Sequence, residues 1–84
     1  MPLLNPHHRA LLRLGARPEG VLVAGAAGER AMTRQTAGSY LRRLERAALL
    51  RAELVDGGRL RYTTTADGLI EVDRHAAVDA ARGR

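Results

Sequence analysis

Residues 33–50 have the sequence TRQTAGSYLRRLERAALL, and an Asp-Gly-Gly turn follows at 56–58. Thr33 suits the N-cap of a helix, because its hydroxyl can accept a hydrogen bond from a backbone N–H of the first turn. Four apolar residues then recur at the spacing of one helical face: Ala37, Leu41, Leu44 and Ala48. The sequence therefore predicts a capped amphipathic helix over residues 33–48.

The opposite side of this predicted helix is polar and basic, and it carries Gln35, Ser39, Arg42 and Arg46. A DNA major groove accepts a helix with one apolar side and another side of this kind. Gly38 is expected between these side chains, where it costs about 1 kcal/mol relative to alanine. A glycine there would suit a DNA strand that must approach closely. The same arginine cluster also fits an ordinary solvated helix face.

The residues after this helix predict a β-hairpin over 52–64. Strand alternation puts four apolar side chains on one face: Ala52, Leu54, Leu60 and Tyr62. Gly57 and Gly58 supply the positive-φ residues of a tight turn. Arg59 and Arg61 would then lie on the other face, near the tip of the hairpin.

Two further elements are expected ahead of residue 33. Asn5 and Pro6 start a first helix over residues 6–14, which Gly15 ends. Pro18 and Glu19 favour a second helical start. The apolar residues 21–23 fit either this second helix or a short strand.

A last helix is expected over residues 66–81, with Thr65 as its cap. This helix has two interpretations: it covers the core of its own domain, or it presents apolar side chains to a second copy of the chain. The small core favours a homodimer. The dimerisation residues would be Leu69, Ile70, Val72, Ala76 and Ala77.

Composition supports one basic domain. The chain has 84 residues, no cysteine and a formal net charge of +5, and every basic residue other than histidine is arginine. Residues 1–66 hold eleven arginines against five acids, whereas residues 67–84 hold three against four. A basic body with a nearly neutral tail indicates a polyanionic partner for the body.

Several classes of function are disfavoured. No apolar run approaches the roughly 18 residues that span a membrane, and the first residues lack the order of a signal peptide, so a cytoplasmic, nucleoid-associated protein is expected. With two tyrosines as its only aromatic residues, the chain lacks a platform for stacking single-stranded bases. Nucleotide-binding glycine patterns and catalytic His–acid spacings are absent, which predicts a protein that is not an enzyme and needs no cofactor. His7 and His8 are expected to be an exposed polar pair rather than metal ligands.

The segments 32–37, 41–45 and 47–50 (MTRQTA, LRRLE and AALL) resemble the recognition helix of winged helix-turn-helix regulators and its exit into the first wing strand. Ala48 stands where that exit usually has glycine. Residues 59–69, RLRYTTTADGL, resemble the second wing strand and the Thr-x-x-Gly start of the following helix. The MarR, PadR and ArsR-type repressors share this outline, and the resemblance covers about residues 20–70.

The resemblance implies an α+β fold, a winged helix-turn-helix with three helices, a two-stranded β-hairpin wing and a C-terminal helix. Residues 1–84 would form a single domain, in which 5–66 are the DNA-binding core and 66–81 the C-terminal helix. The major-groove residues would be Arg34, Gln35, Thr36, Ser39 and Arg42. Thr33 and Arg43 would contact phosphates near the rim of the groove, and Arg59 and Arg61 would contact phosphates or an adjacent minor groove.

The function expected from these features is sequence-specific binding of double-stranded DNA by a small homodimeric regulator, a repressor, with no evident small-molecule effector. Two alternatives remain open. One is a plasmid or phage DNA-organising factor that uses the same contacts. The other is a winged-helix protein-interaction module that binds an acidic partner.

Overall fold

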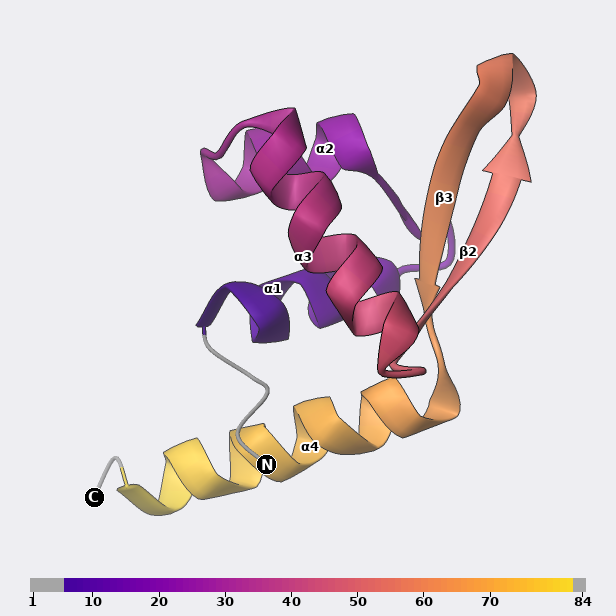
Figure 1. Cartoon of the computed structure of the whole chain (residues 1–84). Coiled ribbons are helices and arrows are strands. Elements are labelled where there is room, and N and C mark those ends of the chain that lie inside the picture. Colours follow the sequence, from indigo (N-terminus) through magenta and orange to yellow (C-terminus); the bar gives the residue numbers. More distant parts are fainter. Residues whose placement is uncertain (1–5, 83–84) are drawn as a thin grey trace.

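The computed structural model describes the backbone of residues 6–82 and the side chains of residues 6–74. Figure 1 shows the order of elements: α1 (Pro6–Gly15), β1 (Val21–Leu22), α2 (Val23–Arg30), α3 (Arg34–Arg46), β2 (Leu50–Val55), a 3-10 turn (Asp56–Gly58), β3 (Arg59–Thr64) and α4 (Ala66–Arg82). α1 lies between α4 and the pair α2 and α3, and the β2–β3 hairpin projects to one side. The predicted α+β fold, with three helices, a hairpin and a C-terminal helix, is confirmed. Asn5, the expected cap of α1, lies outside the described residues.

The start of α2 differs from the expectation. β1 pairs with β3 to complete an antiparallel sheet of order β1-β3-β2, and the helix begins only at Val23. Val21 and Leu22 are therefore a short strand, and Val23 is the first residue of the helix. Gly20 explains why Pro18 and Glu19 start no helix: its φ is 67°, and a Cβ on it would stand 2.8 Å from the carbonyl oxygen of Tyr62. The chain turns there against β3.

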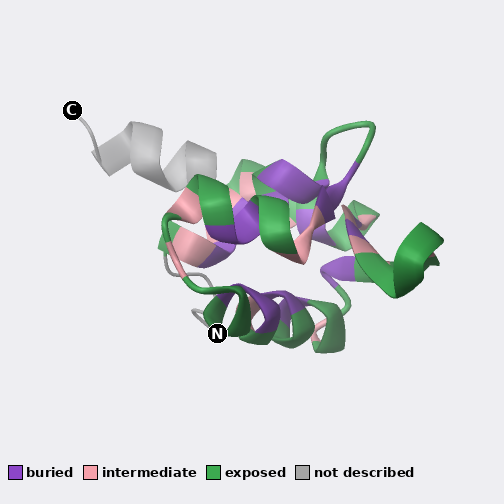
Figure 2. Ribbon diagram, turned by 90° about the horizontal axis from the view of Figure 1, so that it is seen from above, coloured by how far each residue is buried: buried purple, intermediate pink, exposed green. Residues whose placement is uncertain are grey.

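The hairpin has the predicted alternation of apolar side chains. Ala52 lies opposite Tyr62, and Leu54 lies opposite Leu60, so the four apolar side chains share one face. That face is buried only at its base: Tyr62 is 1% exposed, whereas Leu54 is 71% and Leu60 40% exposed. The wing therefore has an anchored base and a solvated tip (Figure 2).

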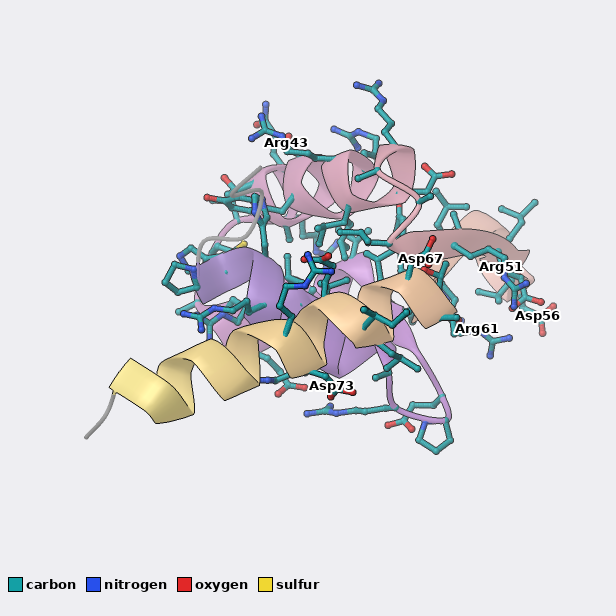
Figure 3. The ribbon with its side chains drawn as sticks, turned by 90° about the horizontal axis from the view of Figure 1, so that it is seen from below. Arg43, Arg51, Asp56, Arg61, Asp67 and Asp73 are labelled. Atoms are coloured by element: carbon teal, nitrogen blue, oxygen red, sulfur yellow. The ribbon has the colours of Figure 1, made fainter. Side chains whose placement is uncertain are left out.

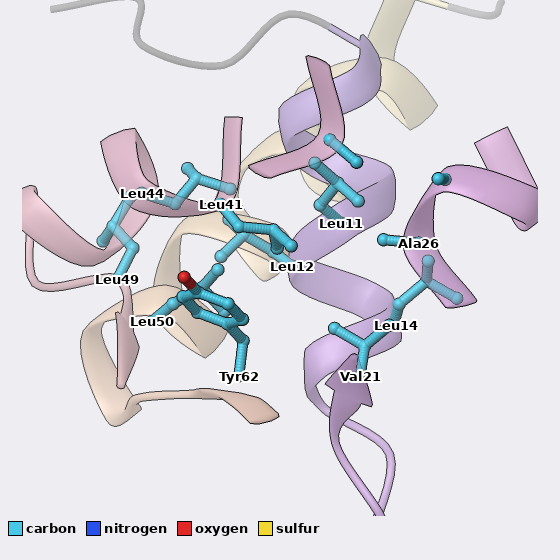
Figure 4. Packing of buried hydrophobic residues seen from close by; sticks show 12 residues of the cluster. Leu11, Leu12, Leu14, Val21, Ala26, Leu41, Leu44, Leu49, Leu50 and Tyr62 are labelled. Atoms are coloured by element: carbon cyan, nitrogen blue, oxygen red, sulfur yellow. The ribbon is translucent and has the colours of Figure 1, made fainter. Parts of the chain in front are cut away.

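The core lies where α1, α3 and the base of the sheet meet (Figure 4). Its largest fully buried side chains are Leu11, Leu12, Leu41, Leu44, Leu50 and Tyr62. One polar contact fastens α1 to the sheet, because the Thr64 hydroxyl donates a 2.6 Å hydrogen bond to the carbonyl of Leu12. Packing of α3 against this core fixes the direction of its outer face.

Both predicted caps are confirmed. The Thr33 hydroxyl accepts a 3.1 Å hydrogen bond from the backbone N–H of Thr36, and the Thr65 hydroxyl accepts one of 3.1 Å from Gly68. Thr65 also donates to the carbonyl of Ala48 at 2.7 Å, so the cap of α4 is tied to the end of α3. These bonds satisfy backbone groups that a helix terminus leaves open.

An alanine in the left-handed region caps α2, and another lies one residue after the C-cap of α3. Ala31 has a φ of 53° and Ala48 a φ of 63°. After α3, the N–H of Leu49 bonds the carbonyl of Leu44 at 3.0 Å, and the N–H of Ala48 bonds that of Glu45 at 2.9 Å. This hydrogen-bond pattern usually places glycine at the left-handed residue. Each alanine therefore costs about 1–2 kcal/mol in backbone strain.

Candidate nucleic-acid interface

α3 presents a continuous polar face to solvent. Thr33 to Thr36, Ser39, Arg42, Arg43 and Arg46 are exposed, whereas Ala37, Gly38, Leu41 and Leu44 are buried. Within the described part of the chain, none of the four arginines of this helix forms an ion pair with a carboxylate. Figure 3 shows Arg43 projecting on the side of α3 that faces away from α4. The helix thus offers uncompensated positive charge from a rigid support.

The predicted groove residues do not all point the same way. Successive residues of a helix are rotated by about 100°. One shallow hollow of about 300 Å³ is lined by Gln35, Thr36, Ser39, Tyr40 and Arg43, and Arg42 and Arg46 line a neighbouring one with Ser39 and Arg43. Arg34 lines neither of these and lies on the side of the helix that faces the wing. The structure therefore brings seven side chains together around the outer face of α3 and separates Arg34 from them.

Gly38 corrects one expectation. It is buried rather than exposed, and a Cβ on it would stand 3.2 Å from Nη1 of Arg42 and 4.0 Å from Cγ1 of Val23. The atoms that approach Gly38 belong to the protein itself, and the nearest is the flexible end of Arg42. Gly38 leaves the space in which the guanidinium of Arg42 lies over α3.

The prediction that His7 and His8 are an exposed pair is also wrong. His8 is 3% exposed, and its ring packs edge-on against Tyr40 with centroids 4.9 Å apart. His7 is half-buried, and Arg30 donates to its Nδ1 at 3.4 Å. The signal was present in the sequence, since His8 shares a helical face with Leu11 and Leu12. Within the described residues, no three His, Cys, Asp or Glu side chains gather as metal ligands would.

Tyr40 is a residue that sequence reasoning missed. It lines the hollow of Gln35 and Arg43 on one side and contacts the rings of His7 and His8 on the other. These ring contacts link α3 to α1. An aromatic residue four positions after Thr36, flanking a polar helix face, was the signal for this role.

The two wing arginines are held differently. Arg59 is exposed, and its Nε donates to the carbonyl of Asp56 at 3.1 Å, which holds the side chain at the tip. Arg61 is half-buried and bonds Oε1 of Glu53 on the neighbouring strand at 2.5 Å. This hydrogen bond and the positive charge hold the pKa of the Glu53 carboxyl below its usual value. Arg59 is thus the more available cation, and Figure 3 shows Arg61 together with Arg51 and Asp56 at the wing end.

The predicted dimerisation residues divide into three groups. Leu69 and Ile70 are exposed, with 45% and 54% of their surface accessible. Val72 packs partly against the core of its own chain. The side chains of Ala76 and Ala77 lie outside the described residues. Among the described helices, none is long and apolar enough to cross a lipid bilayer.

Three helices, a small antiparallel sheet and a hairpin directly after the third helix define a winged helix-turn-helix domain. No protein-family model and no curated protein matches the sequence. Solved structures do match, and MarR-family and related winged-helix transcriptional regulators are among them.

A MarR-family transcriptional regulator from a Rhodococcus species is 26% identical, with a TM-score of 0.85 over 96% of this chain and 59% of that one. The Staphylococcus aureus MepR–DNA complex is 21% identical, with a TM-score of 0.83 over 96% of this chain and 68% of that one. The antimony-specific transcriptional repressor AntR is 25% identical, with a TM-score of 0.73 over 98% of this chain and 75% of that one. This chain spans about six tenths of the length of the Rhodococcus regulator.

Proposed function

We propose that this protein is a small transcription regulator that binds double-stranded DNA in a sequence-specific manner, with α3 in the major groove. The observation that carries this proposal is the outer face of α3, where arginines without carboxylate partners stand beside Gln35 and Ser39. The neighbours are transcription regulators rather than enzymes, and one of them was solved on DNA, which supports the same conclusion.

The side chains fall into those that suit base contacts and those that suit phosphate contacts. Arg42 matches the O6 and N7 edge of guanine, and Gln35 matches the N6 and N7 edge of adenine, each worth about 1–3 kcal/mol of discrimination. Thr33 and Arg43, at the margins of the exposed face, suit phosphates. Arg59 and Arg61 hold the wing on the DNA backbone, with Arg59 the stronger contact because Glu53 does not neutralise it.

The regulator works as a homodimer and as a repressor that occludes a promoter, on the nucleoid in the cytoplasm. The exposed Leu69 and Ile70 of α4 support a second copy as partner, since burial of this apolar surface stabilises association. A twofold dimer presents two α3 helices to successive major grooves about 34 Å apart.

Affinity selection from a pool of random duplexes tests this proposal. We expect enrichment of a twofold-symmetric site whose half-sites lie about 10 base pairs apart. Recovery of DNA with no common sequence would contradict sequence-specific regulation and favour the DNA-organising alternative. Failure to retain any DNA at low salt would favour an acidic protein partner.

A further inference from the structure

A third hollow lies between the start of α2, the start of α3 and the wing. Its volume is about 200 Å³, and its lining is mostly apolar: Leu22, Val23, Ala24, Arg34, Arg59 and Leu60. Two of these residues are arginines, and they reach the hollow from different elements, one from α3 and one from β3. No carboxylate lines it within the part of the chain that the structure describes.

This combination restricts what can occupy the hollow. An apolar floor accepts carbon atoms without a desolvation cost, whereas two guanidinium groups at the rim attract anions and can bond oxygens in pairs. A ligand that suits both must place carbon atoms directly beside a negative group. The sugar–phosphate chain of a nucleic acid has this composition in every repeating unit.

The position of the hollow favours a duplex that already lies on α3. Arg34 is one residue from Gln35, so the two side chains are separated by about 100° around the helix. A duplex whose bases meet Gln35 and Arg42, and whose next groove meets the wing, must pass one strand between α3 and β3. The hollow lies at that place.

We infer that this hollow is a seat for one sugar–phosphate unit of double-stranded DNA. The deoxyribose ring packs on Leu60 and Leu22, and its phosphate lies between Arg34 and Arg59. This inference rests on the proposed function, and it changes one role within it: Arg34 contacts the backbone rather than a base. It also assigns Leu60 a contact that its exposure alone would not indicate.

The hairpin offers a matched pair of variants. Leu54 and Leu60 are cross-strand partners on the same face of the wing, but only Leu60 lines the hollow. Leu60→Asp and Leu54→Asp change the net charge equally, so long-range electrostatics affects both alike. In fluorescence anisotropy on random duplex DNA at about 0.1 M salt, we expect Leu60→Asp to weaken binding about tenfold or more, and Leu54→Asp by less than about threefold. Equal losses would overturn the inference.

If circular dichroism shows that Leu60→Asp does not fold, a second measurement tests the inference. Arg34→Ala should weaken binding by the same factor on a selected site and on random DNA. It should reduce the slope of log affinity against log salt by less than about 0.9, because Arg59 still contacts the same phosphate. Because Arg34 and Arg59 share one phosphate, the double variant should lose less than the product of the two single losses. A loss for Arg34→Ala that is confined to the selected site would overturn the inference and leave the proposed function intact. If the parent protein binds no duplex, the proposed function fails as well.

Discussion

α3 and the β2–β3 wing both present arginines, but the two regions are held in different ways. α3 rests on Ala37, Leu41 and Leu44, which are fully buried, whereas the tip of the wing carries the exposed Leu54. The arginines of α3 have no carboxylate partners within the described residues, whereas Glu53 holds Arg61 on the wing. A rigid helix that carries unpaired arginines suits base reading, which needs defined geometry, and a solvated tip suits a phosphate backbone that repeats along every sequence.

The first prediction breaks the rigid support of α3. Leu44→Ala removes a fully buried side chain and should destabilise the fold by about 2–5 kcal/mol, a large share of the stability of a small domain. Leu54→Ala is the control and should cost less than about 0.5 kcal/mol, because its side chain is 71% exposed. Thermal unfolding followed by circular dichroism measures both. Similar melting temperatures for the two variants would contradict the assigned core.

The second prediction separates the two regions by sequence specificity. Arg42→Ala should weaken binding to a selected site by about 10- to 100-fold and leave random DNA much less affected. Arg59→Ala should weaken binding to both by a similar factor, because phosphates carry no sequence. Anisotropy titrations on the two duplexes give the ratio. A uniform loss for Arg42→Ala would show that α3 does not read bases through this residue.

The third prediction concerns the link between α3 and the wing. Ala48→Gly should stabilise the protein by about 1 kcal/mol, because glycine adopts a φ of 63° without the Cβ clash that alanine has there. The expected rise in melting temperature is about 4–8 °C. Ala47→Gly is the matched control, since Ala47 has a φ of −81° and gains nothing from the change. If Ala48→Gly destabilises the protein as much as Ala47→Gly does, the left-handed conformation assigned to Ala48 is wrong.

The smallest effect is expected from the ion pair of the wing. Glu53→Gln removes the charge that holds Arg61 and should tighten binding to random DNA about two- to threefold. The lowered pKa of Glu53 means that its carboxyl stays ionised as the pH falls from 7 to 5, so the ratio of variant to parent affinity should be the same at the two pH values. Anisotropy at the two pH values checks both statements. Unchanged affinity in Glu53→Gln would show that Arg61 contributes nothing to DNA binding.

Local signals were sufficient for much of the fold. The spacing of Leu41 and Leu44, the caps Thr33 and Thr65 and the paired glycines of the turn predicted α3, the hairpin and α4. These features depend on nearest neighbours in the chain, which a sequence displays directly.

Contacts between distant segments were beyond sequence reasoning. The turn at Gly20 depends on the carbonyl of Tyr62, the burial of His8 depends on Tyr40, and the buried position of Gly38 depends partly on Val23. The placement of Arg34 and Arg59 around one hollow is of the same kind. Periodicity identified a basic helix face correctly, but it could not assign each arginine to a base or to a phosphate.

The most direct test of the central claim is a salt titration of the parent protein on random duplex DNA, with its mass measured by light scattering. If α3 and the wing both contact a duplex, the logarithm of the association constant should fall linearly with the logarithm of the salt concentration. The slope should be about −3 or steeper, because each subunit makes several phosphate contacts. The mass should be that of a dimer. The absence of binding at about 50 mM salt, where phosphate contacts are strong, would contradict the account.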